Sequence, residues 1–397
     1  MKIMADKSII QHLSREVFEK VLKVRHHIHQ YPELSFEEKA TATFICEILS
    51  EEGIEFQAGV GGEGIVARIG KVGSKTIALR ADMDALPIRE ATGAPYSSLN
   101  EGVMHACGHD AHTACLIGAA LVLNRIREEL DGEVRLIFQP GEELLPGGAS
   151  KMIAAGVLER PVPESIFGQH VHPELPVGSM GYCAGAFMAS SDELYIRVEG
   201  RGGHAAMPHR LKDPVLAASA LILALQQVVS RKTNPLIPSV LSFGRFMAEG
   251  ATNVIPSKVD LAGTFRTFDE AWRNAAHAEI EKICRYTGET YSVSIVPEIR
   301  KGYPVLNNHG DLTKWVKEKA EDLLGKEKVV KLEPRMTAED FAYYSHVVPA
   351  SFWRLGTASI DGRNSYPVHH PQFNIDEGAL ETGTALMSWL ALSRLKE

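Results

Sequence analysis

The chain has 397 residues, of which 45% are hydrophobic and 23% are charged. These proportions are those of a soluble globular protein long enough for two compact domains, and they exclude a disordered chain. The formal net charge of -8 and the sequence pI near 6.1 argue against a nucleic-acid surface, because no basic run with interleaved aromatic residues accompanies them.

Cysteine usage and the first residues indicate the compartment. The five cysteines are spread widely without a CxxC pair, which favours a reducing compartment over a disulfide framework. The N-terminus passes directly into charged sequence without the apolar core of a signal peptide. The longest apolar run, residues 215–229, is too short to cross a bilayer. We therefore expect a cytoplasmic protein with no membrane partner.

The first part of the chain, up to residue 183, predicts an α/β domain. Apolar residues at helical spacing predict a helix over residues 8–29, which Pro32 ends. Ser35 and Glu38 form a predicted capping box for a second helix that ends at Gly53. Strands and helices then alternate, which is the α/β pattern. The predicted elements are strands at 65–69 and 76–80, a helix from 114 to about 129, a strand at 134–138, a helix at 147–155 and a strand at 165–168.

From about Ala184 the pattern changes to strand, helix, strand, strand, helix, strand, which predicts a ferredoxin-like domain. We expect residues 184–299 to form this inserted domain, and residues 1–183 and 300–397 to form the first. The predicted elements are a strand at 193–198, a helix from 214 to 229, strands at 239–246 and 258–268, a helix at 270–286 and a strand at 292–296; the last segment adds a helix at 312–324, a strand at 351–355 and a helix at 377–395.

A short segment, residues 104–112, combines a thiol, three imidazoles and a carboxylate just before a predicted helix. Cys107 and His109 are good ligands for a borderline metal such as zinc, once the thiol is deprotonated and the imidazole is neutral. Asp110 is the kind of carboxylate that fixes the tautomer of a ligating histidine. The ordinary alternative is a buried thiol beside a hydrogen-bonded helix cap.

Further polar residues follow three predicted strands, where the functional crevice of an open α/β sheet lies. Asp82 and Asp84 follow one strand, Glu142 and Glu143 the second, and His170 the third. Adjacent glutamates point in different directions, so Glu143 suits a metal ligand and Glu142 a general base. The alternatives are a solvated acidic turn and a core histidine.

A histidine pair near the C-terminus, His369 and His370, offers one more imidazole in a loop. Counting one member of this pair gives five candidate ligands, too many for one tetrahedral catalytic ion with its water. Two ions would use them all. The candidate ligands are Cys107, His109, Glu143, His170 and one of His369 or His370.

The expected inserted domain carries His204 on a glycine loop, which suits a mobile arm that donates a hydrogen bond to an oxyanion. The alternative is a β-turn with an incidental histidine. Asn253 and Arg266 offer an amide and a guanidinium, which suit a substrate carboxylate. Arg266 on a strand is otherwise most often part of a solvated face.

Taken together, these motifs resemble the M20 metallopeptidase and amidohydrolase family, and more closely its branch of N-acyl-amino-acid amidohydrolases, which includes hippurate hydrolases and plant auxin-conjugate hydrolases. The likeness covers nearly the whole chain. The matching segments are residues 25–35 (RHHIHQYPELS), 80–87 (RADMDALP), 105–114 (HACGHDAHTA), 139–143 (QPGEE), 202–209 (GGHAAMPH), 253–256 (NVIP) and 338–341 (AEDF).

The resemblance implies a catalytic domain with a central mixed, mostly parallel sheet flanked by helices, plus a ferredoxin-like lid. It implies two divalent ions, of zinc, manganese, nickel or cobalt, or a cleft that a metal inhibits. His369 is the implied ligand of the histidine pair, because the family's ligand precedes the proline by two positions. The implied ligand set is Cys107, His109, Glu143, His170 and His369, with Asp84 and Asp110 supporting the imidazoles.

Glu142 is the implied base, and His204 the implied oxyanion donor, reaching across a homodimer formed through the lid. The expected reaction is hydrolysis of an N-acyl amino acid, a small molecule whose carboxylate Asn253 and Arg266 would hold. Gly141 stands where alanine is commoner, and His172 where the family often has an aromatic, which bears on the acyl pocket. The alternatives are a dipeptidase or carboxypeptidase on the same scaffold, and a metal-dependent binding or assembly protein without catalysis.

Overall fold

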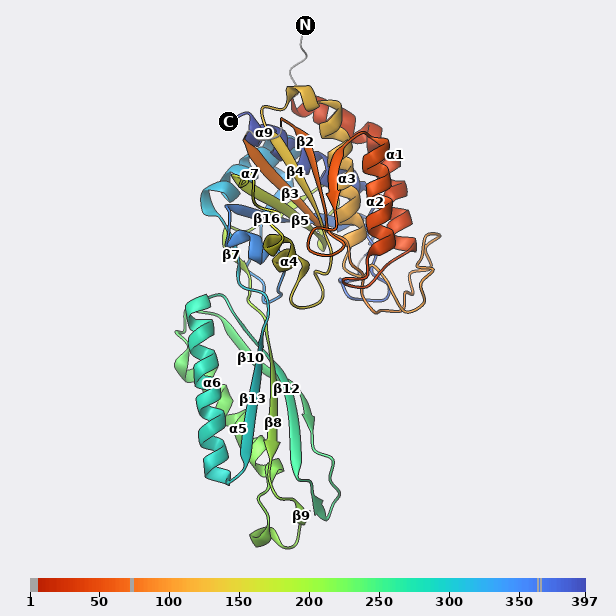
Figure 1. The fold of residues 1–397 in the computed structure, drawn as a ribbon. Coiled ribbons are helices and arrows are strands. Elements are labelled where there is room, and N and C mark those ends of the chain that lie inside the picture. Colours follow the sequence, from red (N-terminus) through yellow and green to blue (C-terminus); the bar gives the residue numbers. More distant parts are fainter. Residues whose placement is uncertain (1–5, 72–74, 363, 365) are drawn as a thin grey trace. The chain divides into compact units, whose positions relative to one another are not determined.

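The computed structural model describes residues 6–71, 75–362, 364 and 366–397, and it divides into two compact units (Figure 1). Unit 1 comprises Met1–Phe187, Asn307–Glu333 and Asp340–Glu397. Unit 2 comprises Met188–Leu306 and Pro334–Glu339. The short second segment belongs to unit 2 because the N–H of Ala189 lies 3.1 Å from the carbonyl oxygens of both Arg335 and Thr337.

Unit 1 is built on an eight-stranded mixed sheet in the order β1-β2-β4-β3-β5-β16-β6-β15. The neighbours β4–β3, β3–β5, β5–β16 and β6–β15 are parallel, whereas β1–β2, β2–β4 and β16–β6 are antiparallel. The expectation of a mixed, mostly parallel sheet is confirmed. The strands are β1 (Glu55–Ala58), β2 (Ile65–Gly70), β3 (Thr76–Asp82), β4 (Glu133–Gln139), β5 (Ser165–Pro176), β6 (Met180–Tyr182), β15 (Val329–Lys331) and β16 (Ala350–Ala358).

Helices cover this sheet, and the central one carries the Cys/His segment. The described residues of β3 and β4 are buried throughout, as expected for central parallel strands covered on both faces. Helix α3 is buried from His109 to Leu123 and packs against α1, α9 and β3. The helices of unit 1 are α1 (Lys7–Gln30), α2 (Lys39–Glu51), α3 (His109–Arg125), α4 (Gly148–Ala154), α7 (Gly310–Leu324), α8 (Ala342–Ser345) and α9 (Gly378–Leu395), with short 3-10 turns η1 (Arg127–Glu129) and η4 (Lys326–Lys328).

The start of α2 differs from the predicted capping box. Ser35 donates instead to Asp84 Oδ2 (2.6 Å), and Glu38 accepts the N–H of Gly141 (2.7 Å). The carboxylate of Glu33 caps the helix, accepting the N–H groups of Ala40 (3.0 Å) and Thr41 (2.8 Å). The capping-box prediction was wrong because its two polar side chains are used to connect α2 to the loops around the candidate site.

Unit 2 has the ferredoxin-like arrangement that the sequence predicted. Its antiparallel sheet has the order β10-β12-β8-β13, and helices α5 and α6 pack against each other and against this sheet (Figure 1). A two-stranded β9–β11 ladder extends the unit. Its elements are β8 (Asp192–Glu199), β9 (Gly203–His204), η2 (Pro208–Arg210), α5 (Pro214–Gln227), β10 (Ser239–Met247), β11 (Val254–Ile255), β12 (Lys258–Thr267), α6 (Glu270–Tyr291) and β13 (Ser294–Lys301). In addition, β7 (Gly185–Met188) pairs with β14 (Leu306–Asn308).

Helix α5 continues into a π-helical segment, η3 (Val228–Lys232). The combined stretch, Pro214–Lys232, is long and apolar enough to cross a membrane by length and composition, so the expectation that it is too short was wrong. One face, including Ala217, Leu221 and Leu225, is buried in the hydrophobic core of unit 2. The helix is therefore a core element of this unit.

Candidate metal centre

The turn before α3 positions the first two candidate ligands. Gly108 precedes the helix with φ of +85°, a left-handed conformation that favours glycine. A Cβ atom at this position would lie 2.5 Å from Cγ2 of Val171 on β5. The glycine thus allows the turn to approach β5 closely, so that Cys107 Sγ lies 3.3 Å from His170 Nε2.

The five candidate ligands converge within unit 1. His369 Nε2 lies 3.2 Å from Glu143 Oε1, and His109 Nε2 lies 4.0 Å from the same oxygen. Ligand atoms of Cys107, His109 and His170 lie within 4.8 Å of one another, and so do those of Cys107, Glu143 and His369. Cys107 is common to both groups, so the geometry offers two adjacent sites with one shared thiol.

Hydrogen bonds orient two of the imidazoles for metal binding. His170 Nδ1 lies 2.8 Å from the carbonyl oxygen of Val171, so Nδ1 carries the proton. Nε2 therefore carries the lone pair that can bind a metal. His109 Nδ1 lies 3.0 Å from Asp84 Oδ1. Although burial alone would raise the pKa of Asp84, the hydrogen bond to His109 lowers it. Asp84 therefore stands as an ionised carboxylate behind His109.

The free nitrogen of His109 is the strongest sign that the centre fits a metal. His109 Nε2 and Glu143 Oε1 are buried and form no hydrogen bond of good geometry among the described residues, although Glu143 Oε1 lies 3.2 Å from His369 Nε2. Buried polar atoms normally have a partner, and a bound ion can be the partner where protein atoms provide none. Thiolate, imidazole and carboxylate together suit a borderline divalent ion such as zinc.

Glu142 lies beside this cluster. A carboxylate oxygen of Glu142, a ring nitrogen of His109 and a carboxylate oxygen of Glu143 lie within 4.8 Å of one another. The backbone N–H of Asp340 donates to Glu142 Oε1 at 3.4 Å. Glu142 is therefore held at the edge of the ligand set while Glu143 faces His369.

The structure distinguishes the two C-terminal histidines. His369 has φ of +65° and donates its N–H to the carbonyl of Ala106 (2.7 Å), beside Cys107. The ring of His370 instead stacks on Tyr366 with 4.5 Å between centroids, and its Nδ1 accepts the N–H of Gln372 (3.1 Å). His369 is thus the member of the pair that lies among the candidate ligands.

Asp110 lies away from the ligands, unlike the sequence prediction. It binds Arg25 Nε (3.0 Å) and His29 Nδ1 (2.8 Å) of α1, and the pKa of its carboxyl is lowered by these cations against the opposing effect of burial. Asp110 therefore connects the start of α3 to α1 through these hydrogen bonds. His172, two residues after His170, is buried and lies 4.0 Å from Glu174 Oε2.

The remaining predicted residues belong to unit 2. His204 is exposed on β9, and its Nδ1 accepts the N–H of Ala206 (3.1 Å), which leaves Nε2 as the donor. Asn253 lies next to it, because its carbonyl accepts the N–H of Ala205 (3.0 Å). Arg266 lies on β12, where its Nη1 donates to the carbonyl of Met336 (3.0 Å). The structure thus groups His204 with Asn253 within this unit.

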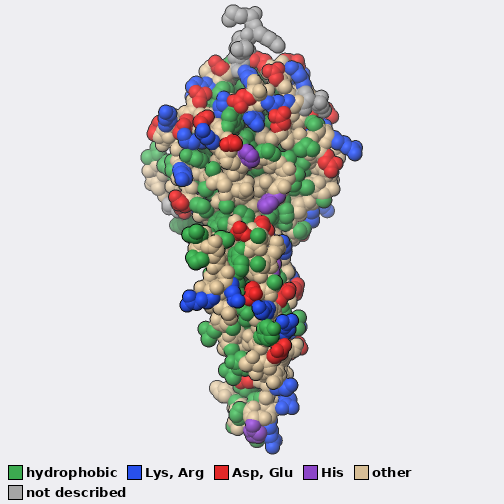
Figure 2. Space-filling model, turned by 90° about the vertical axis from the view of Figure 1, so that its left-hand side faces the viewer, with side chains coloured by type: hydrophobic (Ala, Val, Ile, Leu, Met, Phe, Trp, Pro, Cys, Tyr) green, Lys and Arg blue, Asp and Glu red, His purple; other side chains and the backbone are tan. Residues whose placement is uncertain are grey.

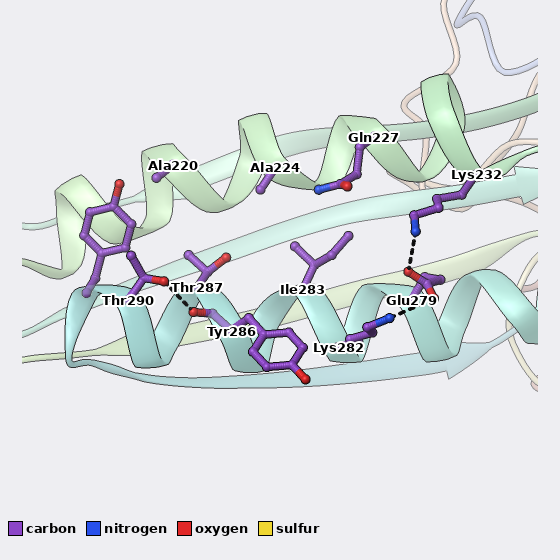
Figure 3. Close-up of a pocket in the computed structure, with 11 residues that line it drawn as sticks. Ala220, Ala224, Gln227, Lys232, Glu279, Lys282, Ile283, Tyr286, Thr287 and Thr290 are labelled. Carbon is purple, nitrogen blue, oxygen red and sulfur yellow. Dashed lines mark hydrogen bonds and ion pairs between the residues drawn. The ribbon is translucent and has the colours of Figure 1, made fainter.

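A groove of about 470 Å³ lies between α5 and α6 in unit 2 (Figure 3). It is lined by threonine, tyrosine and lysine side chains, and its one carboxylate, Glu279, lies 3.6 Å from both Lys232 and Lys282. The groove therefore holds no set of residues that suits metal-dependent hydrolysis. On the face in Figure 2, acidic and basic side chains of the described residues are intermixed.

Sequence reasoning assigned no role to several buried polar residues next to the ligands, although it had placed Asp82 among the carboxylates that follow predicted strands. Arg80, Asp82, His112 and Asp340 are fully buried and hydrogen-bonded to one another in series. A usable signal was present: Arg80 and Asp82 interrupt a buried strand, and His112 follows His109 by three residues, which is the same face of a helix.

Comparison with known proteins agrees with this geometry. Residues 78–393 match the model of peptidase family M20/M25/M40. The chain belongs to this family. The resemblance inferred from the motifs is therefore confirmed.

Individual relatives of the M20 family cover most of the chain. An N-acetyl-L-cysteine deacetylase of Bacillus subtilis is 42% identical over 361 residues, covering 91% of this chain and 84% of the relative. An N-acyl-L-amino acid amidohydrolase of Geobacillus stearothermophilus is 41% identical over 308 residues, covering 77% and 83%. A solved structure from Bacillus subtilis, a dinuclear metal binding peptidase from the M20 family, is 36% identical with a TM-score of 0.82, covering 96% of this chain and 99% of that chain.

Proposed function

We propose that this M20 protein is a metal-dependent amidohydrolase that cleaves N-acyl amino acids into a carboxylic acid and an amino acid. The observation that carries the proposal is the convergence of a thiol, imidazoles and a carboxylate beside a second, buried glutamate. The names of the deacetylase and amidohydrolase relatives support this substrate class. The same residues would hold two divalent ions: Cys107, His109, Glu143, His170 and His369.

Divalent ions bound there supply Lewis acidity and make water a usable nucleophile at neutral pH. Glu142 is the proposed base: it takes a proton from the attacking water and delivers it to the nitrogen of the leaving amino acid. The new C–O bond forms first and leaves an oxyanion on the former carbonyl carbon, and the C–N bond then breaks as its nitrogen receives the proton from Glu142. The N–H of Asp340, 3.4 Å from Glu142 Oε1, helps to fix the orientation of this carboxylate.

Unit 2 supplies the proposed substrate contacts. His204 Nε2 would donate a hydrogen bond to the oxyanion formed on the substrate carbonyl. Asn253 and Arg266 would bind the free carboxylate of the amino acid, since a guanidinium matches a carboxylate with two donors. The exposure of His204 and its proximity to Asn253 support a joint role.

We also propose a cytoplasmic homodimer joined through unit 2. The partner is a second copy of the chain, because α5 exposes Leu216 (56%) and Leu223 (75%) on the face opposite its buried one. Strand β10 is at the edge of its sheet and exposes Phe246 and Met247. Edge strands and large apolar side chains of this kind commonly pair with another chain.

Five unpaired cysteines support the proposed cytoplasmic location, because a reducing compartment keeps thiols free.

The variant Glu142→Gln tests the reaction. It keeps the shape of the side chain but removes the base, so we expect kcat on N-acetyl and N-benzoyl amino acids to fall about 10²–10⁴-fold. Metal content is measured on the same samples and should match that of wild type. The control is Glu128→Gln, whose side chain is 88% exposed. Unchanged turnover by Glu142→Gln with metal bound would refute the assignment, and faster turnover of dipeptides would favour a peptidase.

A further inference from the structure

Four fully buried residues of unit 1, Arg80, Asp82, His112 and Asp340, form a polar network that the proposed reaction does not use. They lie in three of the sequence motifs: residues 80–87, 105–114 and 338–341. One end of this network touches the chain beside a candidate ligand, and the other touches the proposed base.

His112 forms the ligand end. Its Nδ1 donates to Asp82 Oδ1 (2.6 Å), and its Nε2 accepts the N–H of Val171 (2.9 Å). Both ring nitrogens are therefore engaged, so His112 is not available as a metal ligand, although its ring centroid lies 4.7 Å from that of His170. Val171 is also the residue whose carbonyl holds His170 Nδ1. His112 thus fixes the backbone residue that orients the ligand.

Arg80 connects this end to the base. Its Nη1 donates to Asp82 Oδ2 (2.6 Å) and its Nη2 to Asp340 Oδ1 (2.7 Å). The carboxylate of Asp340 also accepts the N–H of Ala149 (2.9 Å), and its backbone N–H donates to Glu142 Oε1 (3.4 Å). A continuous series of contacts therefore runs from the backbone beside His170 to the carboxylate of Glu142.

Burying charges of this kind gives little net stability, because desolvation offsets the attraction between them. A fixed geometry at a catalytic centre, by contrast, depends on such supporting contacts. We propose that His112, Asp82, Arg80 and Asp340 are positioning residues that hold the metal ligand His170 and the base Glu142 in one arrangement. The part that concerns Glu142 rests on the proposed function.

Two conservative variants test the two ends. His112→Asn keeps a donor for Asp82 and loses the acceptor for Val171, whereas His112→Gln places an acceptor near the position of Nε2. Arg80→Lys keeps the charge and loses the fork that holds two carboxylates. The matched control is Arg135→Lys on β4, because Arg135 is equally buried and forks onto Glu133 Oε1 (3.1 Å) and the carbonyl of Pro161 (3.1 Å).

Binding of Mn²⁺ to each metal-free variant is measured by calorimetric titration. The kcat and KM of each variant on N-acetyl amino acids are then measured by steady-state kinetics. We expect His112→Asn to weaken Mn²⁺ binding about 10–100-fold, and His112→Gln to restore much of the loss. Arg80→Lys should lower kcat about 10–100-fold with KM nearly unchanged. Arg135→Lys should lower the melting temperature and leave these constants as in wild type.

The proposal fails if His112→Asn and Arg80→Lys lower the melting temperature like Arg135→Lys but keep wild-type metal affinity, kcat and KM. Should Arg80→Lys not fold, Asp340→Asn replaces it, because Asn retains the backbone donor to Glu142 and loses the charge facing Arg80. If wild type turns over no N-acyl amino acid, the proposed function is wrong, and the Mn²⁺ affinities of His112→Asn and Arg135→Lys then decide for or against the network.

Discussion

At the residue scale, His369 and His370 provide a matched pair for testing the metal centre. His369 lies 3.2 Å from Glu143, whereas His370 stacks on Tyr366. We expect His369→Ala to lose about one ion per chain and at least tenfold in kcat, because a ligand is removed. His370→Ala should keep the metal content of wild type and a kcat within about threefold of it. Metal content by mass spectrometry and steady-state kinetics are the measurements, and equal losses in the two variants would contradict the ligand assignment.

Gly108 and Gly102 separate backbone strain from close packing. Both have left-handed φ, +85° and +81°, but a Cβ atom on Gly108 would meet Val171 at 2.5 Å, whereas one on Gly102 would meet nothing within 4 Å. We expect Gly102→Ala to lower the free energy of unfolding by about 1 kcal/mol. Gly108→Ala should lower it by about 2–4 kcal/mol through the added overpacking. Urea denaturation measures both, and equal effects would show that the contact with β5 is unimportant.

The residue types that converge at the candidate site could be read from the sequence, whereas the contacts of the supporting residues could be read only in part. Asp110 is adjacent to His109 in sequence, but successive residues of a helix point about 100° apart. Asp110 consequently faces α1, and the carboxylate behind His109 is Asp84, which lies two residues after the end of β3. The residue types alone left His369 and His370 open, and the spacing of the resembling family to the proline implied His369, which is also the one that lies among the candidate ligands.

At the scale of elements, buried apolar runs were identified, and short or polar strands were not. The strands β1 and β15 have four and three residues and are largely exposed, so they carry no alternation of apolar residues. Strand β5 extends to Pro176, well past the predicted end at 168, because buried histidines interrupt its apolar run. His170 therefore lies within a strand, near the level of Asp82 on β3, since Arg80 pairs with Gly168.

Within unit 2, Asp192 joins the start of β8 to α6. It accepts hydrogen bonds from His277 (2.6 Å) and Arg273 (3.0 Å). Although burial alone would raise the pKa of Asp192, these hydrogen bonds lower it to about 2. A carboxyl whose pKa is lower when folded stabilises the fold above its unfolded pKa, about 3.9, and this contribution is lost as the pH falls towards 2.

The variant Asp192→Asn tests this linkage. We expect it to lower the free energy of unfolding at neutral pH by about 2 kcal/mol, the equivalent of the pKa shift. The difference from wild type should narrow between about pH 4 and pH 2. Urea denaturation at several pH values measures it, with Asp131→Asn, a side chain that is 65% exposed, as the control. A difference that stays constant with pH would show that the ionised carboxylate is not the stabilising group.

At the scale of the whole molecule, the proposed homodimer joined through unit 2 would allow His204 of the partner subunit to serve a metal centre. Mixing the inactive variants Glu142→Gln and His204→Ala tests this arrangement. A mixed dimer then has one centre with an intact Glu142 served by an intact His204, and one centre with neither. Random exchange in an equal mixture makes half of the dimers mixed, so about a quarter of wild-type activity should return. If His204 acts within its own chain, every centre lacks one group and the mixture stays inactive.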